Sequence, residues 1–234
     1  KGDGSTARFG GRGAERTDPV TFPNKPEVLF ARSRFSRSNY GNVGRSRAAF
    51  STPNQMKRSQ LFSSRPLWWE EGGVSDPTVI NFAGKTHMLY QAAGSDGLSR
   101  LGLAVASDGE RFERLDLPIL EGDERTTLER LGLVTPRITH LGRDFYIAYT
   151  ALSVYPAESV KAPDSAVPWR SRISLLKTRD LRRFERLGAV MADLDSHDPV
   201  LFPVPFQRNY WLLHRLDKGM HVSISSNLRS WGGG

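Results

Sequence analysis

Three dipeptides of an acid or a hydroxyl residue followed by proline recur along the chain, each opening a short apolar run. They are Asp76-Pro77, Thr135-Pro136 and Asp198-Pro199, so the spacings are 135 − 76 = 59 and 198 − 135 = 63 residues. If these dipeptides occupy equivalent positions in a repeated unit, two carboxylates and one hydroxyl face each other. Carboxyl groups serve as general acids and bases, so Asp76 and Asp198 are candidate catalytic residues.

Proline restricts the backbone at all three positions. It fixes its own φ and disfavours helical geometry in the residue before it. The sequence therefore predicts an extended backbone at Asp76, Thr135 and Asp198, with each side chain held in one direction. A plainer interpretation stays open, in which these residues only cap the turn at the start of a strand.

Two arginines form a second set of equivalent positions. Arg100 and Arg172 each stand eight residues before the aspartate of a polar turn, since 108 − 100 = 8 and 180 − 172 = 8. A guanidinium is a rigid fork that binds phosphate or paired hydroxyls, so the two arginines suit an anionic or hydroxyl-rich ligand. The alternative is an ion pair at the rim between each arginine and the aspartate of a turn.

Histidines gather near the third copy, where His197 precedes Asp198 and His214 precedes Arg215. Neighbours in a strand point to opposite faces, so His197 and Asp198 need not touch. No His, Asp or Glu spacing repeats in a known ligand pattern, so no metal site is predicted. The chain contains no Cys, which excludes disulfides and thiol chemistry from it.

The segments that carry these residues follow one plan in each copy. An apolar run, a polar turn and an alternating stretch predict a hairpin, a third strand follows, and an aromatic residue then begins a fourth strand. The hairpin turns are Ala83-Gly84-Lys85, Leu141-Gly142-Arg143 and Phe206-Gln207-Arg208-Asn209, and the third strands are Arg100–Ala104, Arg172–Leu176 and His221–Ile224. Side-chain oxygens in turns such as Ser107-Asp108-Gly109 usually bond to the nearby backbone, so we interpret these turns as structural.

Four short antiparallel strands cannot bury their faces alone, so repeated units of this kind must stack on one another. The sequence therefore predicts an all-β fold, a β-propeller, in which equivalent residues of each unit meet in the funnel at one end of the axis. Three partial copies do not close a ring, so we expect an incomplete set of blades in this chain.

Charge divides the chain into two parts. Residues 1–66 contain 13 Lys and Arg against 4 Asp and Glu, a net charge of +9, and the remainder has 33 − 13 = 20 basic and 25 − 4 = 21 acidic residues. We therefore predict a basic, low-complexity, disordered segment over residues 1–60 and a propeller domain over residues 61–234.

The basic segment admits several interpretations. Its Arg, Phe and Tyr side chains would suit stacking on nucleic acid, but we favour a solvated linker, since basic low-complexity tails are often just that. An organelle transit peptide would be equally rich in Arg and Ser, yet the amphipathic periodicity is missing. No run is long enough to span a membrane, and we expect a cytoplasmic protein.

One insertion interrupts the regular plan. Residues Ser153–Ser171 give the second copy a long loop with three prolines and Trp169. Long insertions on a regular scaffold are often functional, and an aromatic ring there can stack on a sugar. Most of the other aromatic residues are better explained as propeller core.

The ordered set of motifs resembles one known family. The motifs are Ser99–Ala104, Asp108-Gly109, Gly132–Thr139, Phe145–Ala151, Arg172–Leu176, Asp198–Pro203 and Leu213–Arg215. Together they cover roughly residues 62–231 and resemble the β-mannoside phosphorylases and hydrolases of glycoside hydrolase family 130.

This resemblance implies a five-bladed β-propeller whose central pocket holds mannosyl saccharides, cleaved by inorganic phosphate in some members and by water in others. It implies an oligosaccharide ligand, no cofactor, and inorganic phosphate as the co-substrate of the phosphorylases. By position, Thr135 stands where the family has its proton donor. The residues matched to substrate- or phosphate-binding positions are Arg100, Arg137, Arg172, His197, His214 and Arg215.

Two positions depart from the family's pattern. Val134 and Thr135 replace the acids of the motif Gly-x-Glu-Asp-Pro-Arg, and His197 replaces a lysine. A threonine hydroxyl does not deliver a proton near neutral pH as a carboxylic acid does.

Two hypotheses of function follow. In the first, the protein is a glycoside phosphorylase or hydrolase acting on β-mannosides or related oligosaccharides, with Asp76 or Asp198 as acid or base. In the second, it is a carbohydrate-binding propeller that has lost its proton donor. An inactive fragment is a third alternative, and the oligomeric state stays open.

Overall fold

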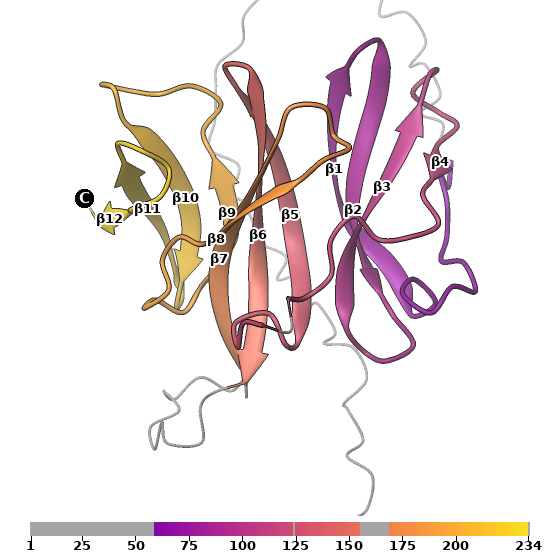
Figure 1. Cartoon of the computed structure of the whole chain (residues 1–234), viewed down its shortest axis with the longest axis horizontal. Coiled ribbons are helices and arrows are strands. Elements are labelled where there is room, and N and C mark those ends of the chain that lie inside the picture. Colours follow the sequence, from indigo (N-terminus) through magenta and orange to yellow (C-terminus); the bar gives the residue numbers. More distant parts are fainter. Residues whose placement is uncertain (1–58, 124, 155–168, 234) are drawn as a thin grey trace, which may run out of the picture. The chain divides into compact units, whose positions relative to one another are not determined.

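The computed structural model describes residues 59–123, 125–154 and 169–233, all within the compact unit Met56–Gly234 (Figure 1). The regular structure of these residues consists of β-strands alone, which confirms the all-β prediction for the part of the chain that is described. The predicted basic segment lies outside the described residues, apart from Ser59 and Gln60. Most of the predicted insertion, residues 155–168, lies outside them too.

The strands form three successive antiparallel groups, which we call the first, second and third blades. The first blade is β1 (Gly73–Phe82), β2 (Lys85–Ala93), β3 (Ser99–Ala106) and β4 (Glu113–Arg114), the second is β5 (Gly132–Leu141), β6 (Asp144–Val154), β7 (Trp169–Thr178) and β8 (Glu185–Ala189), and the third is β9 (Ser196–Leu201), β10 (Tyr210–Leu216), β11 (Gly219–Ser225) and β12 (Gly232–Gly233). The outer strands begin directly after Phe112, Phe184 and Trp231, as the repeat predicts.

The turns between strands are built by local hydrogen bonds. Ala83 and Gly84 both have positive φ, 50° and 74°, which is the geometry of a tight two-residue hairpin. After each third strand, Asp108, Asp180 or Asn227 accepts hydrogen bonds from backbone N–H groups two and three residues further on. The structural interpretation of these turns is therefore confirmed.

The blades stand side by side and share apolar cores (Figure 1). Leu89 and Leu101 of the first blade pack with Ile147 and Leu176 of the second. A separate core joins the second blade to the third. Hydrogen bonds also link the inner strands β1, β5 and β9. The backbone N–H of Ile138 donates to the Thr78 hydroxyl over 3.3 Å, and the Thr139 hydroxyl donates to the carbonyl of Leu201 over 2.9 Å.

Each inner strand carries a β-bulge at its proline. In the first blade Ser75 pairs with Gln91 and Thr78 with Leu89, so Asp76 and Pro77 together oppose Tyr90. The same offset places Thr135-Pro136 opposite Tyr149 and Asp198-Pro199 opposite His214.

The bulge overturns one expectation from the sequence. Asp76, Thr135 and Asp198 are not extended but have φ of 49°, 51° and 55°. Two residues must fit against one partner, and a left-handed residue accommodates the extra length by bending the strand. Proline therefore marks the position correctly, whereas the bulge decides the conformation.

A buried glutamate anchors the residue opposite the bulge in the second blade. Glu129 accepts a hydrogen bond from the Tyr149 hydroxyl over 2.7 Å, forms an ion pair with Arg186 of β8, and accepts the backbone N–H of Asp123. Both Glu129 and Tyr149 are buried. This network ties the entry to β5, the second strand and the outer strand together.

The first blade repeats this arrangement. Glu70, fully buried, contacts the Tyr90 hydroxyl at 3.5 Å and forms ion pairs with Arg65 and with Arg114 of β4. Arg114 and Arg186 occupy the same position after the aromatic residue that opens each outer strand. The residues beneath the two bulges are therefore held by the same chemistry.

Replacing Glu129 by alanine should destabilise the domain by about 3 kcal/mol, because the change leaves a guanidinium and a buried hydroxyl without their common acceptor. Urea denaturation followed by tryptophan fluorescence measures the free energy of unfolding. Glu110→Ala is the control: this exposed side chain has no partner among the described residues, and its loss should cost less than about 0.5 kcal/mol. Equal losses in the two variants would contradict the anchoring role.

Candidate functional site

The three bulges lie at the same end of adjacent inner strands, where partly exposed charged side chains meet. Arg137, on β5, directs its guanidinium across to Asp76 on β1, with 4.0 Å between Nη2 and Oδ1. Each of the two side chains keeps more than a third of its surface exposed, 37% for Arg137 and 36% for Asp76. The first two blades thus bring one carboxylate and one guanidinium together beside Thr135.

Thr135 is held by hydrogen bonds to neutral groups rather than by an ion pair. Its Oγ1 lies 2.9 Å from Oγ1 of Thr150, and its backbone N–H donates to Oε1 of Gln91 over 3.2 Å. Thr150 also accepts the backbone N–H of Asp198 over 3.2 Å. One buried threonine therefore joins the bulge of the second blade to the bulge of the third.

Sequence reasoning missed Gln91 and Thr150. Both follow the residue that opposes the bulge, and Arg215 follows His214 in the same way. The sequence therefore contains these residues at a repeated position in each second strand. That position can be recognised only once the offset of the bulge is known.

Asp198, His197 and Arg215 form a second charged group, on β9 and β10. Arg215 Nε lies 3.3 Å from Oδ2 of Asp198 and also donates to Nε2 of His197. Partial burial lowers the pKa of His197 below its usual value, and the nearby Arg215 acts in the same direction. His197 and Asp198 thus share one arginine, although the sequence left their contact open.

His214 does not join this group. Its ring is buried, with Nδ1 2.8 Å from the Ser196 hydroxyl and Nε2 3.0 Å from the Ser223 hydroxyl. Burial lowers its pKa. With both ring nitrogens occupied, His214 fills the place that tyrosine holds in the other two blades, and the prediction that it contacts ligand finds no support in this geometry.

Arg100 is also largely engaged within the fold. It forms two hydrogen bonds to the Asp96 carboxylate, 3.0 and 2.6 Å long, and lies 4.3 Å from the ring centroid of Trp68. Glu121 is a further partner at 3.4 Å. The alternative of an ion pair with the aspartate of a turn is therefore confirmed for Arg100, with Asp96 of the turn between β2 and β3 as the partner.

Arg172 is fully buried and is likewise paired with an acid, Asp195 of the loop before β9. Its guanidinium contacts Asp195 and the carbonyls of Ala192 and Ser171. Its Nη2 has no hydrogen-bond partner among the described residues. An unsatisfied buried donor is costly, and Nη2 can still donate to a further acceptor.

The arrangement suits a hydroxyl-rich ligand with an anionic neighbour. Carboxylates accept hydrogen bonds from sugar hydroxyls, and the guanidinium groups of Arg137 and Arg215 can donate to sugar or phosphate oxygens. Within the described ranges no three His, Asp or Glu side chains gather closely enough to hold a metal ion. No helix in those ranges has the length and apolar character needed to cross a membrane.

Comparison with known proteins identifies relatives of this chain. Residues 54–234 match the family glycoside hydrolase 130, described as beta-1,4-mannooligosaccharide phosphorylase. A 1,2-beta-oligomannan phosphorylase of Thermoanaerobacter sp. is 30% identical over 170 residues, which cover 70% of this chain and 53% of that protein. A beta-1,2-mannobiose phosphorylase of the same organism is 27% identical over 161 residues, 63% of this chain and 48% of that protein. The chain spans about half the length of the curated relatives it matches.

Solved structures share the fold. A glycosyl hydrolase from Bacteroides ovatus superposes with a TM-score of 0.58 at 19% identity, covering 70% of this chain and 49% of that one. The beta-1,2-mannobiose phosphorylase from Listeria innocua, solved as a complex with beta-1,2-mannobiose, gives 0.55 at 17% identity, covering 67% and 56%. The chain therefore contains part of a five-bladed β-propeller, as predicted.

The Thr150 hydroxyl can be tested by Thr150→Val, which keeps the side-chain shape and removes both hydrogen bonds. We expect a loss of about 1–3 kcal/mol in the free energy of unfolding, because the Thr135 hydroxyl and the Asp198 backbone N–H, both partly buried, lose their partner. Thr86→Val is the matched control, since among the described residues the Thr86 hydroxyl bonds only to the exposed Asn81 side chain. A Thr150→Val variant as stable as the control would show that this link between blades does not contribute to stability.

The buried His214 predicts a pH dependence of stability. Its pKa lies below the unfolded value of 6.5, so the unfolded state binds more protons between the two values. The contribution of neutral His214 to the free energy of unfolding should therefore be complete above pH 6.5. It should be lost as the solution is acidified from pH 6.5 through the folded pKa. His214→Gln should flatten this slope, whereas His140→Gln, at an exposed position of β5, should keep it. Parallel slopes in all three proteins, measured by urea denaturation at several pH values, would count against His214.

Proposed function

This chain belongs to glycoside hydrolase family 130, and on that basis we propose that the protein acts on β-mannosides or related oligosaccharides as a glycoside phosphorylase or hydrolase. The observation that carries the proposal is the convergence of Asp76 with Arg137, and of Asp198 with Arg215, at the bulged ends of neighbouring inner strands. Both pairs are partly exposed, so a ligand at this end of the blades can reach them.

The reaction needs a nucleophile and a proton. An oxygen of phosphate or water bonds to the anomeric carbon, the glycosidic C–O bond breaks, and the leaving oxygen takes up a proton. We assign the proton donor to Asp76 or Asp198, the two carboxyl groups on either side of Thr135. Inorganic phosphate, where it is the nucleophile, would contact the exposed guanidinium groups of Arg137 and Arg215.

Arg172 is fully buried and its guanidinium is already paired with Asp195. Together with Arg100 and His214, it holds the scaffold around the site. We therefore propose a smaller ligand-binding set than the sequence alone suggested.

One observation favours a second candidate, a carbohydrate-binding propeller without catalysis. At the position of the family's proton donor stands Thr135, whose hydroxyl is hydrogen-bonded to Thr150. A hydroxyl in that place can hold a sugar through hydrogen bonds but cannot supply a proton at neutral pH. The oligosaccharide ligand is common to both candidates, and they differ only in the chemical step.

The deciding experiment incubates the full-length protein with β-1,2- and β-1,4-mannobiose, with and without inorganic phosphate, and measures mannose and mannose 1-phosphate. We expect product from the wild type. Asp76→Asn or Asp198→Asn should lower kcat by roughly 100-fold or more, depending on which carboxyl is the donor. Thr135→Asp should raise kcat, since it restores an acid at the family's position.

The controls separate the two candidates. Glu110→Gln, an exposed change in the turn after β3, at the opposite end of the strands from the bulges, should leave kcat unaltered. If only Thr135→Asp yields product while the wild type still binds mannobiose in calorimetry, the enzyme hypothesis is rejected in favour of the binding propeller. Neither product nor binding in any variant would refute both.

A further inference from the structure

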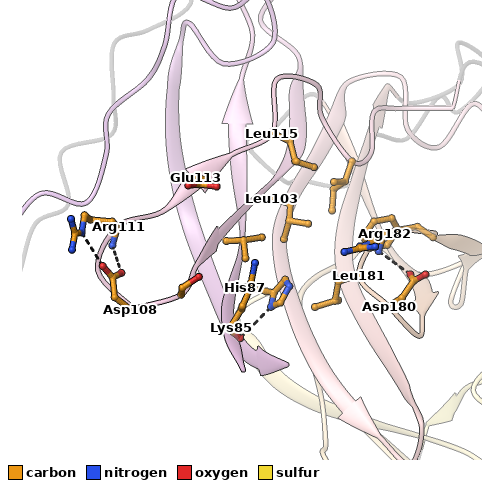
Figure 2. Close-up of a pocket in the computed structure, with 14 residues that line it drawn as sticks. Lys85, His87, Leu103, Asp108, Arg111, Glu113, Leu115, Asp180, Leu181 and Arg182 are labelled. Carbon is orange, nitrogen blue, oxygen red and sulfur yellow. Dashed lines mark hydrogen bonds and ion pairs between the residues drawn. The ribbon is translucent and has the colours of Figure 1, made fainter. Parts of the chain in front are cut away.

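A pocket of about 600 Å³ opens between the first and second blades, at the opposite end of the strands from the bulges (Figure 2). Lys85 and His87 lie at the start of β2, directly after the hairpin, whereas Gln91, which contacts the bulge of Thr135, lies near the end of that strand. Arg182 reaches the pocket from the turn between β7 and β8 (Figure 2). The proposed saccharide site does not use this pocket.

Its volume is that of a small-molecule site, which commonly measures about 300–1,000 Å³. The floor is apolar and comes from both blades, with Leu103 and Ile119 on one side and Leu181 and Phe184 on the other. Leu103 and Leu181 are buried, so the floor is part of the packed core. Such a surface accepts the C–H face of a sugar ring or the face of a nucleobase.

Some of the charges that line the pocket are already satisfied. Asp108 pairs with Arg111 over 2.9 Å and also accepts two backbone N–H groups. Asp180 accepts the backbone N–H groups of Arg182 and Arg183, 2.9 Å each. These carboxylates fix the two turns that form the rim.

Two cations are left without a counter-ion. The Lys85 ammonium and the Arg182 guanidinium form no ion pair or side-chain hydrogen bond with any described residue. Both repel the charged form of the His87 ring, and, together with burial as the largest cause, they lower its pKa. Nδ1 of His87 lies 3.3 Å from the carbonyl of Lys85 and so carries the proton of the neutral ring, which leaves Nε2 as a hydrogen-bond acceptor for a ligand hydroxyl.

The geometry points to a binding site for an organic phosphate, a small molecule that joins one phosphate group to a sugar. Its phosphate would lie between Lys85 and Arg182, one of its hydroxyls would donate to Nε2 of His87, and its ring would lie on the apolar floor. Glu113, on β4, would accept hydrogen bonds from its hydroxyls. Sugar monophosphates and nucleoside monophosphates share this chemistry, and inorganic phosphate lacks the part that the floor and Glu113 recognise.

The third blade offers a matched control for Arg182. Arg229 occupies the same place in the equivalent turn, two residues after Asn227 as Arg182 is two residues after Asp180. Arg229 carries the same charge and is exposed, but it does not line this pocket. Replacing either arginine by glutamine changes the net charge of the protein equally.

The test is calorimetric titration of the full chain with mannose 1-phosphate, with AMP and with inorganic phosphate, each at 0.15 M salt, roughly physiological ionic strength. We expect at least one of the two organic phosphates to bind more tightly than inorganic phosphate. The Lys85→Gln/Arg182→Gln double variant should weaken that binding by roughly tenfold or more, through the loss of charge-assisted hydrogen bonds. Arg229→Gln should leave it unchanged, and circular dichroism should show all variants folded.

Other outcomes overturn the proposal. Binding of inorganic phosphate as tight as that of both organic phosphates would mark the pocket as a general anion patch. Binding lost in Arg137→Gln but retained in the double variant would place the ligand at the saccharide site, which would support the proposed function and reject this pocket. No binding of any probe would reject the pocket and leave the mannobiose assay untouched.

Discussion

The candidate site depends on one backbone constraint, the placing of two residues of each inner strand against a single residue of its neighbour. Asp76, Thr135 and Asp198 adopt positive φ to satisfy it. Such a conformation costs a non-glycine residue about 1–3 kcal/mol, and it persists only where the surrounding structure demands it. The residues that oppose the bulges impose this conformation, because Tyr90, Tyr149 and His214 are buried with their polar atoms hydrogen-bonded. Because the same solution recurs in three blades, the three side chains emerge at one end of the strands.

Burial then decides which cations remain for a ligand. Arg100 and Arg172 are buried, and a buried guanidinium needs a carboxylate and further hydrogen bonds to offset its desolvation. Asp96 and Asp195 supply them, so these two arginines hold the loops between the strands. Arg137 and Arg215 stay partly in solvent, where they can exchange a protein partner for a sugar or a phosphate. Arginines that look equivalent in the sequence therefore divide into scaffold and site.

The repeat predicted the strands, the turns and the shared end of the inner strands, because these depend on patterns that recur in all three copies. It did not predict the buried acids. Glu70 and Glu129 each stand six residues before the bulge, since 76 − 70 = 6 and 135 − 129 = 6, but the third copy has Ala192 there and so weakens the signal. Polarity alone gave no reason to bury them, since their partners Arg114 and Arg186 lie on distant outer strands. The left-handed backbone before proline was missed because local steric preference pointed the other way, and the bulge register overrode it.

The departure at Thr135 is a change of one side chain on a backbone that is otherwise the same. Its φ differs by only 51 − 49 = 2 degrees from that of Asp76 and by 55 − 51 = 4 degrees from that of Asp198, although those residues are acids. The groups around it, the amide of Gln91 and the hydroxyl of Thr150, are neutral and able to hydrogen-bond either a hydroxyl or a carboxyl group. The bulge therefore does not require an acid, and holding the ligand and delivering the proton are separable properties of this site. In the enzymatic form of the proposed function, Asp76 or Asp198 on a neighbouring inner strand would supply the proton, and the bulges place one of these carboxyl groups on each side of Thr135.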